Sequence, residues 1–370
     1  MPAKDFNSNP SNLPHPIAKK LIEWYLQRKR SLPWRDHPEP YAVWVAEIMA
    51  QQTRLDTMLP YFDRWMLSFP DIYQLAQADQ QDVLKAWEGL GYYQRARNLH
   101  KAAKMIVAEY QGQIPKRIEQ LLKIPGIGPY TAGAIASIAF QKDEAAVDGN
   151  AARVLARLFT IRAPINKNSG LKEAWQRARS ILPENQSSDF NQALMEMGAN
   201  VCLPRLPKCD QCPLVMHCEA HQQGIEKELP IRDKIKNIPT KHYAAWALIN
   251  RASVLLRQRP QDALLGGLWE FPNIEIENGK KVKLLIQKNA QALGYSLSKL
   301  ESLLPIDHQY SHFKAKVLAY SCRQIGKRKK IAKDAPYRWL LISQLKDVAM
   351  GKIDRNIADQ ITSAVGLRHE

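Results

Sequence analysis

Four cysteines lie close together in one segment of this chain, and they limit its fold more than any other feature. Cys202, Cys209, Cys212 and Cys218 follow the spacing C-x6-C-x2-C-x5-C. Four thiolates within reach of one point indicate a metal or cluster site instead of a disulfide framework. Structural zinc usually takes two short cysteine pairs that lie far apart, whereas a [4Fe–4S] cluster tolerates one compact loop. We therefore predict a [4Fe–4S] cluster on these four ligands, with zinc as the alternative. Chance clustering is disfavoured because Cys322 is the only other cysteine in the sequence.

Charge and length limit the kind of partner. The chain has 370 residues, enough for two domains, and a net charge of +17, more than half of it in residues 241–370. This excess points first to nucleic acid and second to an acidic membrane surface, with plain solubility charge as the alternative. No apolar run is long enough to span a bilayer, and residues 1–16 lack the apolar core of a signal peptide. With reduced thiols, these features predict a cytoplasmic protein without a membrane segment, and we expect a monomer.

The first part of the chain has the periodicity of helices. Apolar residues recur three and four positions apart in residues 41–53, 82–87, 97–110 and 191–201. Pro and Gly separate these segments, and strand-like alternation is missing from the sequence here. We therefore predict an all-α domain over residues 1–223, with the cysteine loop at its end.

The pattern changes after residue 223. Residues 224–242 are basic, contain two prolines and predict a linker. Residues 245–256 are apolar and rich in strand formers, and residues 311–319 alternate with a period of two. Helical periodicity returns in residues 282–293 and 354–365. These features predict an α+β domain over residues 243–370.

Residues 118–140 contain a candidate phosphate-binding hairpin. A short amphipathic segment leads into Pro-Gly-Ile-Gly, in which Gly126 and Gly128 permit a tight turn and a close approach to a phosphate. A second helix is expected from Pro129, and its first amides favour an anion. The arrangement is that of a helix-hairpin-helix, which contacts the DNA backbone independently of sequence. A plain helical turn with glycine caps is the alternative.

Several motifs in a fixed order carry a family resemblance. The hairpin comes first, Asp148 follows twenty residues after Gly128, and the cysteine loop comes last. In this order they resemble the endonuclease III superfamily of DNA glycosylases and, within it, the MutY family of adenine glycosylases. The resemblance extends over nearly the whole chain and includes residues 32–35 (LPWR), 47–54 (EIMAQQTR), 89–93 (GLGYY) and 147–150 (VDGN).

The resemblance implies a reaction and its residues. Relatives that also cleave the DNA strand have a lysine where this chain has Tyr130, and a phenol cannot form the Schiff base that strand cleavage needs. The resemblance assigns Glu47 to protonation of adenine N7 and activation of water, and Asp148 to stabilisation of the sugar cation, beside Asn150. Because Glu47 lies in an apolar helical segment, we expect burial to favour its protonated form.

The family motifs also imply where DNA would bind. A base must leave the duplex to be cleaved, so a pocket for flipped adenine is expected. By position in the motifs, its lining is Arg30, Leu32, Trp34, Gln192 and Tyr130. Two further residues, Gln52 and Tyr92, match those that wedge into the base stack, although core packing is the alternative for Tyr92. In the cysteine loop, Arg205 and Lys208 are expected to face the DNA backbone.

The second domain resembles the Nudix-type domain of the MutY family. Residues 266–272 (GGLWEFP) carry this resemblance. Active Nudix hydrolases bind magnesium through an acidic helix, but residues 282–293 contain no acidic residue, so the domain is expected to bind and not to hydrolyse. Its expected ligand is 8-oxoguanine opposite the adenine. The family's recognition motif is Phe-Ser-His, and this chain has Tyr310, Ser311 and His312, in which the tyrosine departs from the family but keeps an aromatic face.

The sequence thus predicts a monofunctional glycosylase that removes adenine mispaired with 8-oxoguanine or guanine in double-stranded DNA. One alternative is a pyrimidine-lesion glycosylase with lyase activity, of the endonuclease III type. Tyr130 and the second domain argue against it. Another alternative is a non-catalytic damage-binding protein, against which the presence of both Glu47 and Asp148 argues.

Overall fold

The computed structural model describes residues 15–233, 237–277, 281–327 and 337–366, which form two compact units. The first unit comprises Met1–Gln52 and Met105–Ile235, and the second comprises Thr53–Lys104 and Lys236–Glu370. Residues 1–14 lie outside the described residues, as do residues 278–280, 328–336 and 367–370 of the basic part of the chain, 241–370. Among the residues described, no helix combines the length and the apolar character needed to cross a bilayer.

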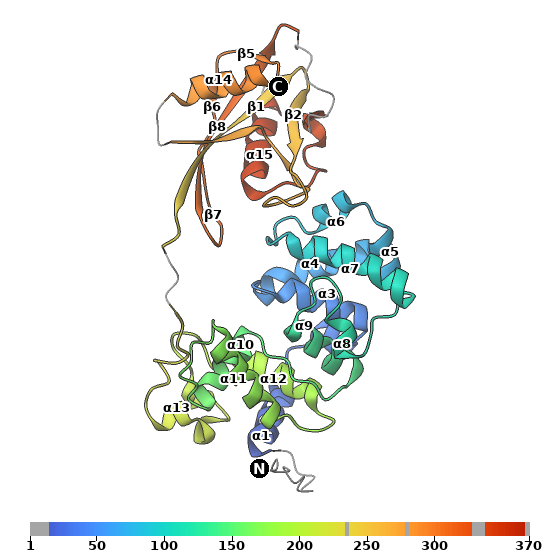
Figure 1. Ribbon diagram of the computed structural model, residues 1–370, viewed down its shortest axis with the longest axis vertical. Coiled ribbons are helices and arrows are strands. Elements are labelled where there is room, and N and C mark those ends of the chain that lie inside the picture. The colour runs from blue at the N-terminus through green and yellow to red at the C-terminus, as the bar shows by residue number, and fades with distance from the viewer. Residues whose placement is uncertain (1–14, 234–236, 278–280, 328–336, 367–370) are drawn as a thin grey trace, which may run out of the picture. The chain divides into compact units, whose positions relative to one another are not determined.

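The described residues of the first unit are helical, as the apolar periodicity predicts (Figure 1). Their α-helices are α1 Pro16–Arg28, α2 Pro33–Asp36, α3 Pro40–Ala50, α8 Ile118–Leu121, α9 Pro129–Ala134, α10 Gly149–Leu158, α11 Asn168–Ser180, α12 Ser187–Asn200 and α13 Glu219–Gln222. A π-helical turn, η1 Ile135–Ala139, continues α9, and two 3-10 turns, η2 Cys209–Gln211 and η3 Val215–His217, lie in the cysteine loop.

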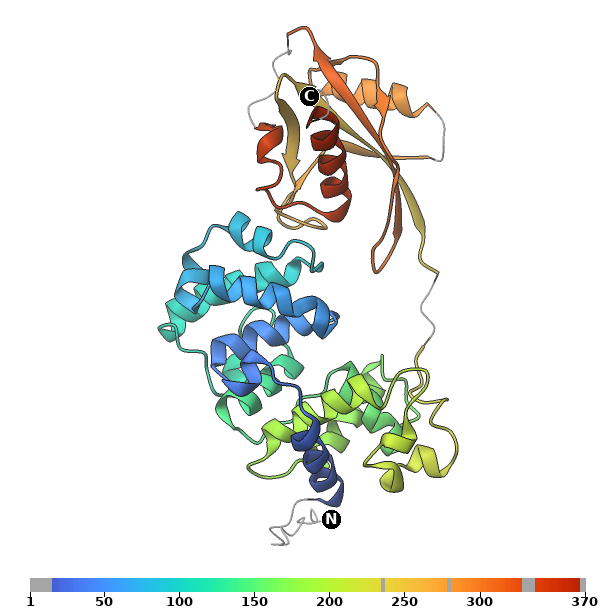
Figure 2. The ribbon, with the colours of Figure 1, turned by 180° about the vertical axis from the view of Figure 1, so that it is seen from behind.

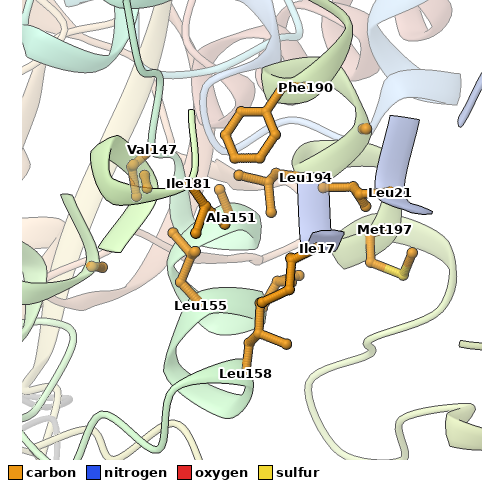
Figure 3. Packing of buried hydrophobic residues seen from close by; sticks show 14 of the residues in the cluster. Ile17, Leu21, Val147, Ala151, Leu155, Leu158, Ile181, Phe190, Leu194 and Met197 are labelled. Atoms are coloured by element: carbon orange, nitrogen blue, oxygen red, sulfur yellow. The ribbon is translucent and has the colours of Figure 1, made fainter. Parts of the chain in front are cut away.

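The core of the first unit fixes α10 between neighbouring helices. Helix α12 packs against both α10 and α1, and Figure 2 shows α1 beside it. Figure 3 shows Leu155 of α10, Leu194 of α12 and Leu21 of α1 in one buried cluster. Each fully buried leucine stabilises the fold by about 1.5–3 kcal/mol. This packing orients the amino-terminal end of α10, where Asp148 lies.

The second unit begins with helices and continues with a sheet. Its helices before the sheet are α4 Leu55–Ser68, α5 Ile72–Gln77, α6 Gln80–Ala86 and α7 Gln94–Tyr110, the last of which continues into the first unit. The later elements are β1 Thr240–Asn250, β2 Ser253–Gln258, β3 Trp269–Glu270, β4 Asn273–Ile276, α14 Val282–Ala292, β5 Ser296–Leu297, β6 Glu301–Ser302, β7 Ile306–Gln309, β8 Lys314–Ile325, β9 Tyr337–Leu341, η4 Ile342–Gln344 and α15 Lys352–Gly366.

Two details of the strands differ from the sequence expectation. Strand β1 begins at Thr240, inside the segment predicted as a linker. The apolar segment 245–256 forms parts of two strands, because the chain turns at Arg251 with a φ of 53°. Periodicity alone does not locate such a turn, since the apolar residues continue on both sides of it.

The sheet has a parallel pair at its centre. Strands β1 and β8 are parallel over the register Thr240↔Lys314 to Ile249↔Arg323, while β2, β4, β5, β6 and β7 pair antiparallel with one of these two. Alternate residues of β1 enter different cores: Ala245 packs with α15, and Trp246 packs with α14. The two helices therefore cover opposite faces of the sheet (Figure 1).

Candidate active site

Glu47 is a buried carboxyl on α3. The helix begins at Pro40, whose ring suits the first helical position, and residues 43–49 are buried. Glu47 belongs to this buried run, and the residue is 6% exposed. Burial raises the pKa of Glu47 to about 7, although a hydrogen bond from Tyr130 acts in the opposite direction, and the charge of Asp148 raises it further. The expected burial of Glu47 is confirmed, and its carboxyl can hold a proton near neutral pH.

The hairpin places Tyr130 against this carboxyl. Its hydroxyl donates a hydrogen bond to Glu47 Oε2 and lies 3.2 Å from the sulfur of Met195. Burial, followed by the charge of Glu47, raises the pKa of Tyr130 well above its usual value. Tyr130 therefore remains a protonated phenol that can donate to Glu47.

The two hairpin glycines have different conformations. Gly126 has a φ of 82°, in the left-handed region that favours glycine. Gly128 is the N-cap of α9, with an extended backbone at φ −94° and ψ 179°. A Cβ on Gly128 would meet nothing within 4 Å. Gly126 therefore supplies the left-handed residue of the turn, whereas Gly128 has a backbone that other residues also adopt and leaves open space at the start of the helix.

Asp148 is held by hydrogen bonds at the start of α10. Its Oδ1 accepts from the backbone nitrogen of Ala151 at 2.7 Å, and its Oδ2 accepts from Asn150 Nδ2 at 2.9 Å. Burial raises the pKa of Asp148, while these bonds act to lower it. Asp148 is therefore an N-cap, and it is also close enough to Glu47 to affect its pKa.

Asn191 positions the segment that leads to Asp148, and sequence reasoning did not single it out. The residue is fully buried on α12. Its Nδ2 donates to Ser137 Oγ at 2.9 Å and to the Glu144 carbonyl at 2.8 Å. Its Oδ1 accepts from the Ala146 nitrogen at 2.9 Å. Ser137 lies in η1, and π-helical turns are frequent at functional sites. One amide thus links the hairpin to the backbone before Asp148.

Besides Tyr130 on α9, the predicted pocket residues lie on α2, α12 and the segment before α2. Leu32 and Trp34 are buried, as is Gln192, whose Nε2 donates to Ser188 Oγ at 3.2 Å within α12. The guanidinium of Arg30 is half-buried and is bound to a carboxylate of the chain, Glu196.

Glu196 joins two arginines and is a second residue that the sequence prediction missed. Arg30 donates to it from Nε at 2.7 Å and from Nη2 at 3.1 Å, and Arg35 donates from Nη2 at 2.9 Å. Burial acts to raise the pKa of Glu196, but these bonds outweigh it and the net shift is downward. Its spacing was the available signal, because Glu196 lies four residues after Gln192 and hence on the same face of α12.

Both predicted wedge residues have left-handed backbones. Gln52 is exposed with a φ of 56°, and Tyr92 is 48% exposed with a φ of 49°. Such conformations are uncommon for residues other than glycine and are concentrated at functional sites. Tyr92 is thus not a core residue, and the alternative of core packing is wrong.

The four cysteines surround a small cavity. Cys202, Cys209, Cys212 and Cys218 all line a space of about 30 Å³. Arg157 is buried beside it and donates to Cys202 Sγ at 3.2 Å. Four sulfur donors around one space are the ligands that a [4Fe–4S] cluster takes.

A rival set of metal donors shares one of these cysteines. Among the described residues, one group of three donor atoms lies within 4.8 Å of one another, and it consists of Cys209, His221 and Glu226. It contains one of the four sulfurs, so the cysteines are spread around the cavity instead of gathered at a single ion. The residues therefore fit a cluster better than a zinc ion on four thiolates.

The remaining predicted residues lie on exposed loops. Arg205 and Lys208 are exposed in the cysteine loop. In the turn between β7 and β8, Ser311 and His312 are exposed. Tyr310 is half-buried, and its ring stacks on Phe313 with centroids 4.7 Å apart. Its aromatic face is therefore engaged within the domain, which sequence alone did not indicate. Cys322, the cysteine outside the loop, is a buried free thiol.

Three features of the first unit occur together: a buried acid on α3, a glycine-containing helical hairpin against it, and a capped aspartate at the start of α10. Together they define a helix-hairpin-helix DNA glycosylase site. Residues 45–179 match the HhH-GPD superfamily of base excision DNA repair proteins, and residues 244–360 match the NUDIX domain family. A solved thermostable thymine-DNA glycosylase is similar over 56% of this chain and 95% of its own, at 28% identity and a TM-score of 0.52. The predicted fold class, a helical glycosylase domain followed by a Nudix-like domain, is confirmed.

Curated relatives narrow this class. The adenine DNA glycosylase of Rattus norvegicus is 34% identical over 90% of this chain and 75% of its own length. That of Buchnera aphidicola from Acyrthosiphon pisum is 32% identical over 80% of this chain and 83% of its own. The chain belongs to the adenine DNA glycosylase family.

Proposed function

We propose that this chain is a monofunctional DNA glycosylase of base excision repair, which removes adenine mispaired with 8-oxoguanine or guanine in duplex DNA. The contact between Glu47 and Tyr130 carries the proposal. It places a carboxyl with a pKa of about 7 against Tyr130, the phenol at the position where relatives that cleave strands would have an amine. Membership of the adenine DNA glycosylase family supports the choice of base.

The reaction follows from the two carboxyls. Glu47 gives its proton to N7 of adenine, and the bond between N9 and C1′ then breaks with its electron pair leaving on the base. Asp148 in its ionised form stabilises the resulting sugar cation, and Asn150 supports that carboxylate through the bond to Oδ2. The Glu47 carboxylate takes a proton from water as the water oxygen bonds to C1′. The product is an abasic site with an intact strand.

The flipped adenine would enter a pocket beside Glu47. Leu32 and Trp34 provide buried apolar surface, and Gln192 provides an amide for the edge of the base. The ion pairs of Arg30 with Glu196 fix the wall on the side of α12. Glu196 stays ionised and holds both arginines in place.

Other exposed residues would hold the DNA. The hairpin at Gly126 and Gly128 would contact the backbone through its amides, and Arg205 and Lys208 would add positive charge to the contact. Gln52 and Tyr92 would wedge into the stack, because their exposed side chains stand on strained backbone that the surrounding fold maintains.

The Nudix-like domain would recognise 8-oxoguanine. The exposed Ser311 and His312 offer polar groups at the turn, while Tyr310 supports the turn by stacking on Phe313. Helix α14, with the sequence VKLLIQKNAQA, has no carboxylate for the magnesium that diphosphate hydrolysis needs. We assign catalysis to residues 1–223 and lesion recognition to residues 243–370, in a cytoplasmic monomer. The segment between them, residues 224–242, serves as a linker up to the start of β1 at Thr240.

The cofactor of this proposal is a [4Fe–4S] cluster on Cys202, Cys209, Cys212 and Cys218. The cavity that all four cysteines line supports it, as does the resemblance of the hairpin, Asp148 and the cysteine loop, in this order, to the endonuclease III superfamily. With four thiolate ligands the cluster would brace the loop that presents Arg205, and it would leave the glycosidic bond to Glu47 and Asp148.

A single-turnover assay tests the function. The intact protein is mixed with a duplex that contains one 8-oxoguanine:A pair, and the strand is analysed before and after alkali. We expect strand scission only after alkali, and no efficient borohydride trapping. Scission without alkali would support a lyase, and no scission in either case would support a non-catalytic binding protein.

A further inference from the structure

One surface within the second unit joins the Nudix-like domain to the helices that precede it in the chain. On the helical side it consists of Gln81, Glu88, Tyr93 and Arg97, and on the Nudix-like side of Gly266, Gly267, Met350 and Arg355. We call these eight residues the docking face. Its two sides are more than 160 residues apart in sequence and belong to the same compact unit.

A bidentate ion pair lies in the docking face. Arg355 donates from Nε to Glu88 Oε1 at 2.6 Å and from Nη2 to Glu88 Oε2 at 3.2 Å. The two side chains are 19% and 15% exposed, so water screens the pair less than it screens a surface salt bridge. Arg355 also donates to the carbonyls of Leu345 and Val348, which fix it within its own domain.

Three hydrogen bonds to backbone carbonyls also join the two sides of the docking face. Tyr93 is buried, and its hydroxyl donates to the Met350 carbonyl at 3.0 Å. Arg97 Nη1 donates to the Gly266 carbonyl at 2.7 Å, and Gln81 Nε2 donates to the Gly267 carbonyl at 2.9 Å. The two glycines open the GGLWEFP motif, so part of this motif serves to dock the domain.

The two glycines suit the loop that makes this approach. Gly267 has a φ of 79°, and a Cβ there would lie 3.1 Å from Leu84 of α6. A Cβ on Gly266 would lie 2.3 Å from the carbonyl oxygen of Gln261. Side chains at these positions would separate the two sides or distort the loop that carries the acceptor carbonyls.

Residues of the docking face flank the loop that carries Tyr92. Glu88 and Tyr93, on either side of this loop, both contact the Nudix-like domain. Within the loop, Trp87 Nε1 donates to the Gly91 carbonyl at 3.0 Å, and Arg95 lies between the rings of Trp87 and Tyr92. Tyr92 itself remains exposed. The backbone of the proposed wedge is thus tied to the domain with the proposed lesion-recognition turn.

We propose that the docking face determines specificity by making the Tyr92 loop and the Nudix-like domain one recognition body. This inference rests on the proposed function. If a linker alone connected the two parts, each lesion encounter would have to order them against one another, at an entropic cost. The docked contact removes that cost, so that opening of the base pair and recognition of 8-oxoguanine are coupled.

The test removes the contact from the helical side of the intact chain, so that the fold of the Nudix-like domain is unaffected. Glu88→Ala and Arg97→Ala are made singly and together, with Arg323→Ala, an exposed arginine on β8, as the matched control. Single-turnover rates of adenine release are measured on 8-oxoguanine:A and G:A duplexes. Hydrogen exchange at Met350 and Arg355 reports whether the contact has opened.

We expect the double variant to lose about fivefold or more of the preference for 8-oxoguanine:A, the usual size of a coupling between sites. Its rate on G:A should change less than about twofold in comparison, and exchange at Met350 should rise. An unchanged preference with raised exchange would overturn the inference, as would equal losses on both duplexes or unchanged exchange. Failure of the unaltered chain to release adenine would instead overturn the proposed function.

Discussion

At the scale of single residues, the proposed chemistry depends most directly on the proton of Glu47. We expect Glu47→Gln to slow adenine release by at least about 100-fold, because an amide has no acidic proton and general acid–base groups contribute about 10²–10⁴ in rate. The measurement is single-turnover release from an 8-oxoguanine:A duplex, together with DNA binding, which should persist. Glu23→Gln, at an exposed position of α1, is the control. Turnover retained by Glu47→Gln would refute the role of this residue.

The pH dependence of the rate tests the environment of the same carboxyl. Its protonated form is the active one, so the rate should fall as pH rises through the Glu47 pKa of about 7. The hydrogen bond from Tyr130 lowers this pKa, so Tyr130→Phe should move the fall to higher pH. The measurement is the single-turnover rate across pH, with Tyr110→Phe on α7 as the control. If the rate of Tyr130→Phe falls at the same pH as that of the unaltered protein, or at a lower pH, the assigned effect of Tyr130 on the Glu47 pKa is contradicted.

At the scale of elements, the hairpin and the segment before Asp148 form one packed arrangement. A Cβ on Gly133 of α9 would lie 2.0 Å from the carbonyl oxygen of Ala145. Gly133→Ala should therefore displace the backbone that leads to Asp148, destabilise the fold by about 1–3 kcal/mol and slow adenine release. Thermal unfolding checks the stability, with Gly149→Ala as the control, because a Cβ there would meet nothing within 4 Å. If the melting temperature and the rate of Gly133→Ala are unchanged, the backbone at Ala145 can move away from the added Cβ without affecting stability or Asp148.

The cysteine loop has little regular structure of its own. Its described elements are two 3-10 turns of three residues each and the four-residue α13. We therefore expect the loop to depend on the proposed cluster for stability. The intact protein should absorb near 400 nm and contain about four irons per chain, as thiolate-bound clusters do, and Cys212→Ser should lower both. Cys322→Ser, which changes the buried thiol outside the loop, should lower neither. A colourless protein loaded with zinc would refute the cluster.

What the sequence could predict about the elements depends on the range of the interaction. The helical segments, the hairpin and the burial of Glu47 follow from local periodicity and glycine spacing, and the structure contains them. The ion pairs of Arg30 with Glu196 join residues 166 positions apart. No local pattern specifies such a partner, so Arg30 was predicted to line the pocket without the acid that holds it. Tyr310 and Phe313 lie close together in the sequence, but their stacking depends on the turn between β7 and β8.

At the scale of the whole molecule, the contacts group the chain differently from its hydrophobic pattern. The pattern changes after residue 223, but the second unit joins Thr53–Lys104 with Lys236–Glu370. The contacts responsible, such as that of Tyr93 with the Met350 carbonyl, leave no periodic signal in the sequence. Deletion of residues 241–370 would therefore remove the proposed lesion-recognition turn and expose one side of the docking face at once. A substitution at the turn separates these effects.

The exposed turn of the Nudix-like domain can be tested in the intact chain. We expect the double substitution Ser311→Ala and His312→Ala to reduce the preference for 8-oxoguanine:A over G:A by at least about tenfold, because it removes two polar groups and each lost contact of this kind is worth about 1 kcal/mol or more. The rate on G:A should stay near that of the unaltered protein, since Glu47 and Asp148 lie in the first unit. The ratio of single-turnover rates on the two duplexes is the measurement, and Ser302→Ala on β6 is the exposed control. If the double substitution at the turn leaves the ratio unchanged while Glu88→Ala lowers it, 8-oxoguanine is recognised by residues other than Ser311 and His312.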